Sequence, residues 1–405
     1  MNHAAQASKR CNMRRILKSV IRHGEISRAA LAEEFSLSTA TVTNIVSELM
    51  EFGLLNDGRK DNAAIGRKAK LIRFNGSRYR FVGVVVPTDN LLSVFVCDLN
   101  GTVQARSSRR VEFHVAEDNP DVKVISSISR AVGEFIGAMR DDACVPLSCV
   151  AVSVPGFVNS NQTIYAPFHN WKNMPLAEPL KAETGLAVYM ENVTRIKALS
   201  ELDQVDPAER NILYLALSPG IGMVNFFNGK MVRGRTGRNG EVGHISLNKD
   251  GEACYCGNRG CFELYCGENF ILKNAGNLLY GDDACPVLRD LVVSQNKPLS
   301  IATLFVARSM GSIKVYRLLA TVAEYLGVAL ANIINCYDPD RILISGDIVE
   351  CDSYVLDMAL EEARSRIVSR YSHDLCVECA RVSTGDTVRA LCSYVLNNML
   401  DTIIP

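Results

Sequence analysis

The sequence has no net charge, because 44 lysine and arginine residues balance 44 aspartate and glutamate residues over 405 positions. A protein that covers nucleic acid or an anionic membrane needs an excess of positive charge, so any contact with DNA must be local. We also find no apolar run that we expect to span a bilayer, and residues 1–18 lack the apolar segment of a secretion signal. These absences predict a cytoplasmic protein with no membrane partner.

The sequence is not poor in cysteine, but its 14 cysteines are spread along a long chain. Several stand singly in apolar runs, for example Cys97 in VFVCDL and Cys149 in LSCVAV. A small secreted protein uses cysteines as a disulfide framework, whereas dilute cysteines in apolar runs are typical of reduced core residues. We therefore expect these thiols to be buried and unpaired.

The N-terminal region has the periodicity of three short helices. Residues 12–23 place four apolar side chains on one face and Gly24 follows, a second helix begins at Ser27, and a third begins near Ser38. The apolar stripe of the third helix is Val42, Ile45, Val46 and Leu49. A tight turn between the second and third helices is typical of a helix-turn-helix unit.

The polar face of the third helix carries short, uncharged side chains that can approach base edges and phosphates: Thr39, Thr41, Thr43 and Asn44. Two short strands then flank a basic, glycine-bearing loop that includes Arg67 and Lys68. Together these features predict a winged helix-turn-helix domain over residues 1–77 that contacts DNA. The alternative is a three-helix interaction module with an incidental basic loop.

From about residue 78 the pattern becomes an alternation of β-rich runs and helix-length segments, which indicates an α/β fold. Two halves of similar build are consistent with a duplicated lobe. We expect the first lobe over residues 78–195, with a C-terminal helix at about 386–405 returning to it, and the second lobe over residues 196–385, including a zinc loop and helices for dimerisation.

One short segment, GHISLNKDGEACYCGNRGCFELYCG, gathers residues that bind metals. Cys254, Cys256 and Cys261 follow the spacing CxCxxxxC, and His244 lies upstream. Three thiolates and one imidazole form a closed tetrahedral set, so we predict a structural Zn²⁺ site with Cys266 as the competing fourth ligand. A cluster without metal is the alternative. By contrast, CVEC at Cys376 and Cys379 lies in an extended apolar segment and is predicted to be core.

GEVGHISL followed by CYCGNRGCFE resembles the signature of the ROK family (repressors, open reading frames and kinases). The resemblance implies an N-terminal winged helix followed by an actin-like, ribonuclease-H-like fold of two lobes, as in sugar kinases and the sugar-responsive regulators of the family. It also implies that His244 binds both zinc and sugar, and that Glu241, Glu263 and Asn192 contact sugar hydroxyls. The only tryptophan, Trp171, falls where a sugar-cleft loop is expected, although lobe packing explains it equally well.

The resemblance further implies that a kinase of this family has an aspartate after Asn192, which removes the proton from the attacking hydroxyl. This sequence has Val193 there, and a valine cannot act as a base. The expected phosphate turns are also changed, by Pro87 and Thr88 in the first and by Pro219 in the second. We therefore predict that the cleft binds sugar without phosphorylating it, and that no residue is catalytic.

The sequence thus predicts a sugar-responsive repressor that binds double-stranded operator DNA as a homodimer or tetramer, with a sugar or sugar phosphate as effector and zinc as a structural ion. Two alternatives remain: an active sugar kinase with an attached DNA-binding domain, and a regulator controlled by a protein partner.

Overall fold

The computed structural model describes residues 3–60, 70–86, 90–113, 120–139, 145–159, 163–166, 169, 171–202, 205, 209–281, 284–368, 376–381 and 386–403. The chain divides into two units. The first consists of Met1–Gln204 with Thr387–Pro405, and the second of Val205–Asp386.

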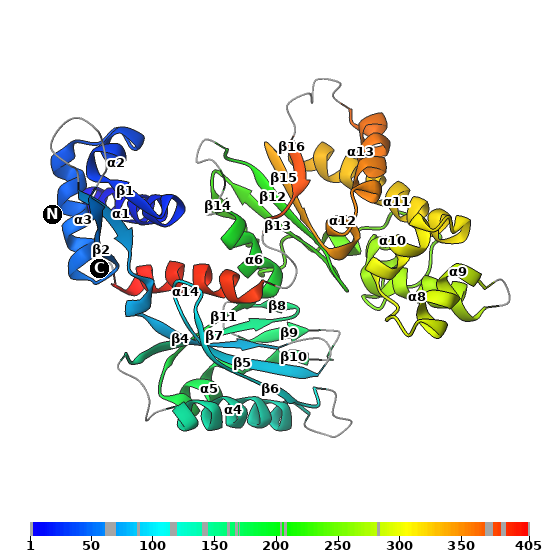
Figure 1. Cartoon of the computed structure of the whole chain (residues 1–405), viewed down its shortest axis with the longest axis horizontal. Helices are drawn as coiled ribbons and strands as arrows, with labels where there is room; N and C mark the ends of the chain where they lie inside the picture. The colour runs from blue at the N-terminus through cyan, green and yellow to red at the C-terminus, as the bar shows by residue number, and fades with distance from the viewer. Residues whose placement is uncertain are drawn as a thin grey trace. The chain divides into compact units, whose positions relative to one another are not determined.

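The N-terminal part of the first unit is a winged helix (Figure 1), with these elements in order: α1 (His3–His23), β1 (Glu25–Ser27), α2 (Arg28–Glu34), α3 (Thr39–Glu51), β2 (Leu55–Lys60) and β3 (Lys70–Phe74). The three strands form an antiparallel sheet in the order β1-β3-β2. The predicted helices and wing strands are present, and β1 was not predicted. α1 begins at His3 instead of residue 12, because its first residues are good helix formers without an apolar face.

Serine side chains start both short helices of this domain. The Ser27 hydroxyl accepts a hydrogen bond from the backbone N–H of Ala30, and the Ser38 hydroxyl accepts one from Thr41, each at 3.1 Å. The apolar faces of the helices form a common core whose members include Ile16, Leu17, Val20, Leu31, Val42, Val46 and Leu49. The winged helix therefore has its own packed interior.

A short link joins the winged helix to the first large sheet. It contains the 3-10 turn η1 (Gly76–Arg78), whose Gly76 carbonyl accepts the N–H of Leu99 at 3.1 Å. The Tyr79 hydroxyl donates to the carbonyl of Phe52, at the end of α3, at 2.5 Å. A Cβ on Gly76 would lie 2.4 Å from the Asn100 side chain, so only glycine fits at this approach.

The large sheet of the first unit has the order β11-β7-β4-β5-β6. Its strands are β4 (Arg80–Val85), β5 (Leu91–Asp98), β6 (Val103–Arg110), β7 (Leu147–Val154) and β11 (Ala187–Asn192). β4, β5 and β6 pair antiparallel, whereas β7 is parallel to both β4 and β11. The central strands are continuous apolar runs because both of their faces are covered.

Helices lie on both faces of this sheet (Figure 1): α4 (Pro120–Met139) and α5 (Ala177–Thr184) on one, and α6 (Val193–Leu202) and α14 (Thr387–Ile403) on the other. A small antiparallel sheet in the order β10-β9-β8 adjoins them: β8 (Phe157–Val158), β9 (Ile164–Ala166) and β10 (Trp171–Met174). The Tyr394 hydroxyl of α14 donates to the Met190 carbonyl of β11 at 3.0 Å. Because α6 packs on α14, the second unit begins at Val205 and not at the expected residue 196.

The second unit repeats the sheet of the first, in the order β14-β13-β12-β15-β16. Its strands are β12 (Ile212–Leu217), β13 (Ile221–Phe227), β14 (Lys230–Met231), β15 (Arg341–Ser345) and β16 (Cys376–Cys379). In both sheets an antiparallel meander of three strands is followed by two strands that are added in parallel. The expectation of two similarly built halves is therefore confirmed.

The helical segments of the second unit are η3 (Val242–His244), α7 (Glu263–Cys266), α8 (Glu268–Tyr280), α9 (Pro286–Arg289), η4 (Asp290–Ser294), α10 (Ile301–Ser309), α11 (Ile313–Tyr337), α12 (Asp347–Glu350) and α13 (Tyr354–Arg366). α11 is long and apolar enough to cross a membrane by length and composition, so the prediction that no such segment exists was wrong. Its buried side chains belong to the core of this unit, against α13, α7 and α8. We interpret it as a core helix, because such helices meet the same criterion.

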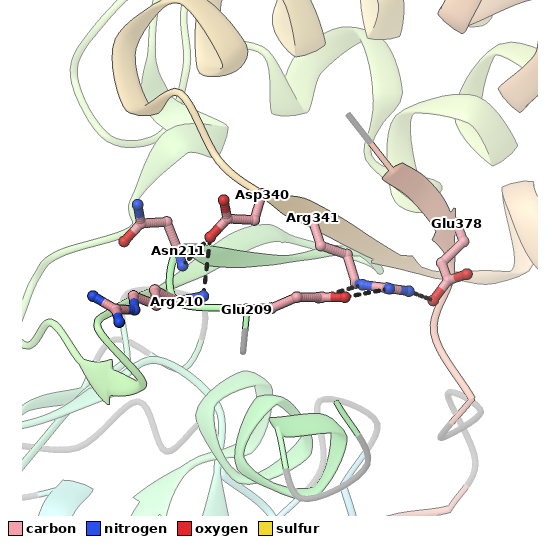
Figure 2. Close-up of polar contacts among 6 residues, drawn as sticks. All are labelled: Glu209, Arg210, Asn211, Asp340, Arg341 and Glu378. Carbon is pink, nitrogen blue, oxygen red and sulfur yellow. Dashed lines mark hydrogen bonds and ion pairs between the residues drawn. The ribbon is translucent and has the colours of Figure 1, made fainter. Parts of the chain in front are cut away.

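Six residues form a polar cluster where the chain enters the second sheet (Figure 2): Glu209, Arg210, Asn211, Asp340, Arg341 and Glu378. The Asp340 carboxylate accepts the backbone N–H groups of Asn211 and Arg210, at 2.8 and 2.9 Å, and these bonds lower the pKa of Asp340. Arg341 forms a bidentate pair with Glu209, at 2.5 and 2.6 Å, and also contacts Glu378. The start of β15 thus holds the segment that leads into β12.

The prediction that the CVEC segment is core was wrong. The segment forms β16, which is extended as expected, but β16 is the terminal strand of the sheet. Cys376 is half-buried and Cys379 is exposed. The isolated thiols Cys97 and Cys149 are buried and reduced, as predicted.

Candidate functional site

The outer face of α3 consists of short polar side chains. Thr39, Thr41, Thr43 and Asn44 are all exposed, and the predicted stripe Val42, Ile45, Val46 and Leu49 is buried beneath them. Two of the hydroxyls also make local hydrogen bonds: Thr41 with Ser38 at 2.8 Å, and Thr43 with the Thr39 carbonyl at 2.7 Å. The wing residues Arg67 and Lys68 lie outside the described residues.

Some of the positive charge near this face is neutralised within the domain. Lys9 of α1 pairs with Glu48 of α3 at 2.6 Å, and Lys70 of the wing pairs with Asp57. The Arg15 guanidinium lies over the Phe35 ring, 4.7 Å from its centre. Among these cations, Lys9 and Arg15 therefore also serve internal packing and charge balance.

The four predicted metal ligands lie together in the second unit. The ligand atoms of His244, Cys254, Cys256 and Cys261 all lie within 4.8 Å of one another. The Cys254 sulfur is 3.7 Å from His244 Nδ1, and the sulfurs of Cys256 and Cys261 are also 3.7 Å apart. A tetrahedral Zn²⁺ with Zn–S bonds of about 2.3 Å separates its sulfur ligands by about 3.8 Å. The donor set and its spacing therefore fit Zn²⁺.

The loop between these ligands is folded by its own backbone hydrogen bonds. The Gly260 carbonyl accepts the N–H of Leu247 at 2.8 Å, and the Asn258 carbonyl accepts that of Cys254 at 2.8 Å. Gly260 has φ +57, and a Cβ there would lie 1.7 Å from the Asn248 carbonyl oxygen. The second glycine of the motif, Gly257, has φ +92 with open space beside it. Glycine is thus required at residue 260 by both conformation and close contact.

The thiols of the cluster hold their protons tightly in the absence of metal. Burial raises the pKa of Cys261 to about 12, and the neighbouring thiols of Cys254 and Cys256 raise it further in the same direction. Three thiolates at this spacing repel one another, so the anionic cluster needs a cation to balance it. A bound Zn²⁺ would supply that charge and would displace the protons.

Cys266 does not take part in the cluster. It is fully buried, and its sulfur lies 3.4 Å from the carbonyl oxygen of Val322 in the core helix α11. His244 is therefore the fourth ligand of the set that the structure brings together.

Next to the cluster lie the two glutamates of the signature. Glu263, the first residue of α7, is only 4% exposed, and its Oε2 accepts the backbone N–H of Ile221 at 2.9 Å. A Cβ on Gly220 would lie 3.2 Å from that oxygen, so glycine leaves room for the carboxylate. Glu241 precedes η3 and is exposed.

The sequence analysis missed Tyr255, which stands between two metal ligands. Its hydroxyl lies 3.5 Å from His244 Nε2, and its ring meets the imidazole edge to face, with the ring centres 5.3 Å apart. Partial burial, and then the nearby Glu263 carboxylate, with which the phenol can form a hydrogen bond, raise the pKa of Tyr255; Glu241 and Cys254 contribute more weakly. The spacing CxC marks the cysteines only and gives no sign that the intervening residue faces both His244 and the signature glutamates.

In the first unit, Asn192 ends β11 and serves a local purpose. Its Oδ1 accepts the N–H of Arg195 at 3.1 Å, which caps α6, and its side-chain amide donates to the Gly156 carbonyl. Val193 is the first residue of α6, so no carboxylate stands at the position where a kinase of this type needs a base.

The altered turns fall partly within the described residues. Ser218–Gly222 forms the turn between β12 and β13, where the N–H of Ser218 donates to the Gly220 carbonyl at 3.2 Å and Pro219 lies between them. Pro87 and Thr88 lie outside the described residues.

Trp171 belongs to the core of the first unit. It is 1% exposed, its indole N–H donates to the Phe113 carbonyl at 3.3 Å, and its ring lies 4.7 Å from that of His169, centre to centre. Of the two interpretations of this residue, the structure favours lobe packing.

Fold and site together define a protein of the sugar-kinase class, with two α/β units of like topology, an additional N-terminal winged helix and a cysteine-rich loop. Residues 90–396 match the ROK family, and residues 12–56 match a winged helix-turn-helix DNA-binding family. The chain therefore belongs to the ROK family.

Two curated relatives are similar over most of the chain. The xylose repressor of Bacillus subtilis (strain 168) is 28% identical over 401 residues, which cover 98% of this chain and 97% of the relative. The DNA-binding transcriptional dual regulator NagC of Escherichia coli (strain K12) is 28% identical over 353 residues, or 86% of this chain and 83% of the relative.

Solved structures agree on the fold. The crystal structure of a ROK family transcriptional regulator, a homologue of the E. coli MLC protein, covers 98% of each chain with a TM-score of 0.77 and 25% identity. A ROK family glucokinase from Streptomyces griseus covers 78% of this chain and 98% of its own, with a TM-score of 0.63 and 19% identity, which shows the fold alone.

Proposed function

We propose that this chain is a sugar-responsive transcriptional regulator that represses carbohydrate-utilisation genes by binding operator DNA. The observation that carries the proposal is the outer face of α3, where Thr39, Thr41, Thr43 and Asn44 are exposed on a helix whose other face is buried in a winged helix. Its presence in one chain with a ROK domain supports regulation over metabolism, as do the names of the relatives.

In this proposal α3 enters the major groove, and its small side chains contact base edges. Asn44 presents an amide, which can pair with adenine through two hydrogen bonds. Arg67 and Lys68 of the wing contact phosphates or the adjoining minor groove, and add affinity that depends on salt. A palindromic operator needs two copies of the winged helix, so the working form is a dimer or tetramer.

The effector is a sugar or sugar phosphate, and its hydroxyls are bound by Glu241, His244 and Glu263 of the second unit and by Asn192 of the first. Carboxylates, an imidazole and an amide are suitable partners for vicinal hydroxyls. Zn²⁺ bound by His244, Cys254, Cys256 and Cys261 acts as a structural ion that fixes the imidazole in position. The protein works in the cytoplasm, where these thiols stay reduced.

The proposal assigns no catalysis to the chain. Val193 at the start of α6 has no proton-accepting group, and loss of a positioned base costs roughly 10²–10⁴ in rate. Pro219 also removes an N–H from a turn that would otherwise hold phosphate. An active kinase and a regulator controlled by a protein partner are outcomes that the experiment below can reveal.

The test uses the purified full-length chain and fragmented genomic DNA from the source organism. We expect a small set of fragments to be retained, and we expect one sugar in a panel of pentoses, hexoses and amino sugars to change their affinity by at least tenfold. Retention that no sugar alters would favour control by a protein partner. Sugar-dependent production of ADP at ordinary turnover would favour the kinase, and failure to enrich any fragment would contradict the DNA-binding function.

A further inference from the structure

Tyr255 has an unusual place among the residues of the second unit. It lies between the metal ligands Cys254 and Cys256, so its backbone belongs to the loop that a metal would fix, yet its side chain is 59% exposed. The ring is therefore free to rotate about its side-chain bonds without any change in the metal cluster. A residue of this kind can move while its surroundings stay rigid.

The hydroxyl of Tyr255 lies among the polar groups that are proposed to bind the effector. It is 3.5 Å from His244 Nε2, and the carboxylates of Glu263 and Glu241 are its nearest acidic neighbours. Because His244 turns Nδ1 toward the Cys254 sulfur, at 3.7 Å, Nε2 is the nitrogen left to face the phenol. The phenol thus sits between one imidazole nitrogen and a pair of carboxylates.

The chemistry of that position is the chemistry of a sugar hydroxyl. A phenol at neutral pH has one O–H to donate and lone pairs to accept, as an alcohol does. It can accept from His244 Nε2–H and donate to the Glu263 carboxylate, whose other bond, from the N–H of Ile221 at 2.9 Å, is already made. A sugar hydroxyl bound by the same two side chains would need the same place.

We propose that the Tyr255 hydroxyl fills a hydroxyl-binding position in the ligand-free protein, and that a sugar must displace it to bind. The inference rests on the proposed sugar-binding function and deepens it. Tyr255 is then a specificity-determining residue that weakens the binding of every sugar by the same internal competition. Only a ligand whose contacts exceed those of the phenol rotates the ring outward, so sugars with few matching hydroxyls are rejected.

The test compares the wild type with Tyr255→Phe, which keeps the ring and removes the hydroxyl. Binding of D-xylose, D-glucose and N-acetyl-D-glucosamine to the zinc-loaded, full-length chain is measured by isothermal titration calorimetry. Since one intramolecular hydrogen bond changes an equilibrium roughly 2- to 10-fold, Tyr255→Phe should bind the same sugar roughly 2- to 10-fold more tightly. Tyr280→Phe, at the exposed end of α8, is the matched control and should bind like the wild type.

A second readout follows the ring itself. Displacement should change the near-ultraviolet absorbance of a tyrosine when sugar is added to the wild type, and Tyr255→Phe should lose that change. The zinc content and thermal midpoint should stay the same in both variants, because neither tyrosine is a ligand.

The outcomes separate the two claims. Equal or weaker sugar binding by Tyr255→Phe, with wild-type binding intact, overturns the competition and leaves the sugar-binding function standing. Binding by Tyr255→Phe alone supports the competition in its strongest form. If neither protein binds any of the three sugars, the sugar-binding function fails for these ligands, and the competition fails with it.

Discussion

The two large sheets have the same strand order but very different ends. In the first unit the ends of the strands serve the fold: Asn192 caps α6, and Trp171 is buried against Phe113. In the second unit, a long excursion after β14 gathers three cysteines, a histidine and two glutamates around one loop. A duplicated scaffold has thus kept one packed copy and one copy that carries most of the polar chemistry.

This difference predicts a division of labour. The helix α3 is joined to the first sheet through Gly76 and Tyr79, whereas the cysteine-rich loop belongs to the second unit. Changes in the loop should therefore alter the response to sugar and spare the affinity for DNA, and changes on α3 should do the reverse. A response needs a sugar that binds one arrangement of the protein better than another.

The largest effect should come from Cys261→Ser. We expect the zinc content to fall from about one ion per chain to about none, because a neutral hydroxyl replaces a buried thiolate ligand. The response to sugar should be lost, and binding of operator DNA should remain. Metal analysis and gel shifts measure both. Cys336→Ser, an exposed cysteine on α11, is the control and should behave like the wild type; loss of zinc there would place the metal elsewhere.

Acid should remove the metal. With the pKa of Cys261 raised to about 12 by burial and neighbouring thiols, the metal-free cluster binds its protons firmly, so protons compete with Zn²⁺ for the sulfurs. The metal-bound state needs deprotonated ligands, hence zinc affinity should fall as the pH falls and rise as it rises. Zinc retained after dialysis across a pH series measures this, and retention that does not depend on pH would argue against thiolate ligands.

The two glycines of the loop offer a matched pair of intermediate effect. Gly260→Ala should destabilise the zinc-loaded chain by about 2–4 kcal/mol, because its Cβ would overlap the Asn248 carbonyl, at 1.7 Å. Gly257→Ala has open space and should cost only about 1–2 kcal/mol, the strain of its positive φ. Denaturant unfolding of the two variants gives the comparison, and equal losses would contradict the geometry of the loop.

The sequence foretold the repeated periods better than the details of the loops. The strands and the helices of the winged domain follow from apolar periodicity, and the ligands of the cluster follow from spacing. Tyr255 could not be foretold, since a residue between two ligands has no periodic signal, and its orientation depends on the fold of the whole loop. The CVEC segment misled because an edge strand and a central strand share the same local pattern.

On the other side of the comparison, Asn44→Ala should weaken binding of the preferred operator by about 1–3 kcal/mol, the value of one bidentate contact with a base. Binding to unrelated DNA should hardly change, because the phosphate contacts remain. Asn277→Ala, an exposed asparagine on α8 of the second unit, is the matched control. Fluorescence anisotropy with both DNAs tests this, and an equal loss on both would mean that Asn44 does not select bases.

The smallest effect should follow from Val193→Asp, which restores a carboxylate where a kinase needs its base. The variant should fold, because an aspartate in the first turn of α6 interacts favourably with the helix dipole, by about 0.3–1 kcal/mol. It should not phosphorylate sugar, since phosphoryl transfer also requires a positioned phosphate, and Pro219 still occupies the turn between β12 and β13. A coupled assay for ADP should give the same background for the wild type, Val193→Asp and the neighbouring control Thr194→Asp. A sugar-dependent rise of roughly 10²-fold or more in Val193→Asp alone would mean that the base was the one missing part, and that the cleft still binds ATP.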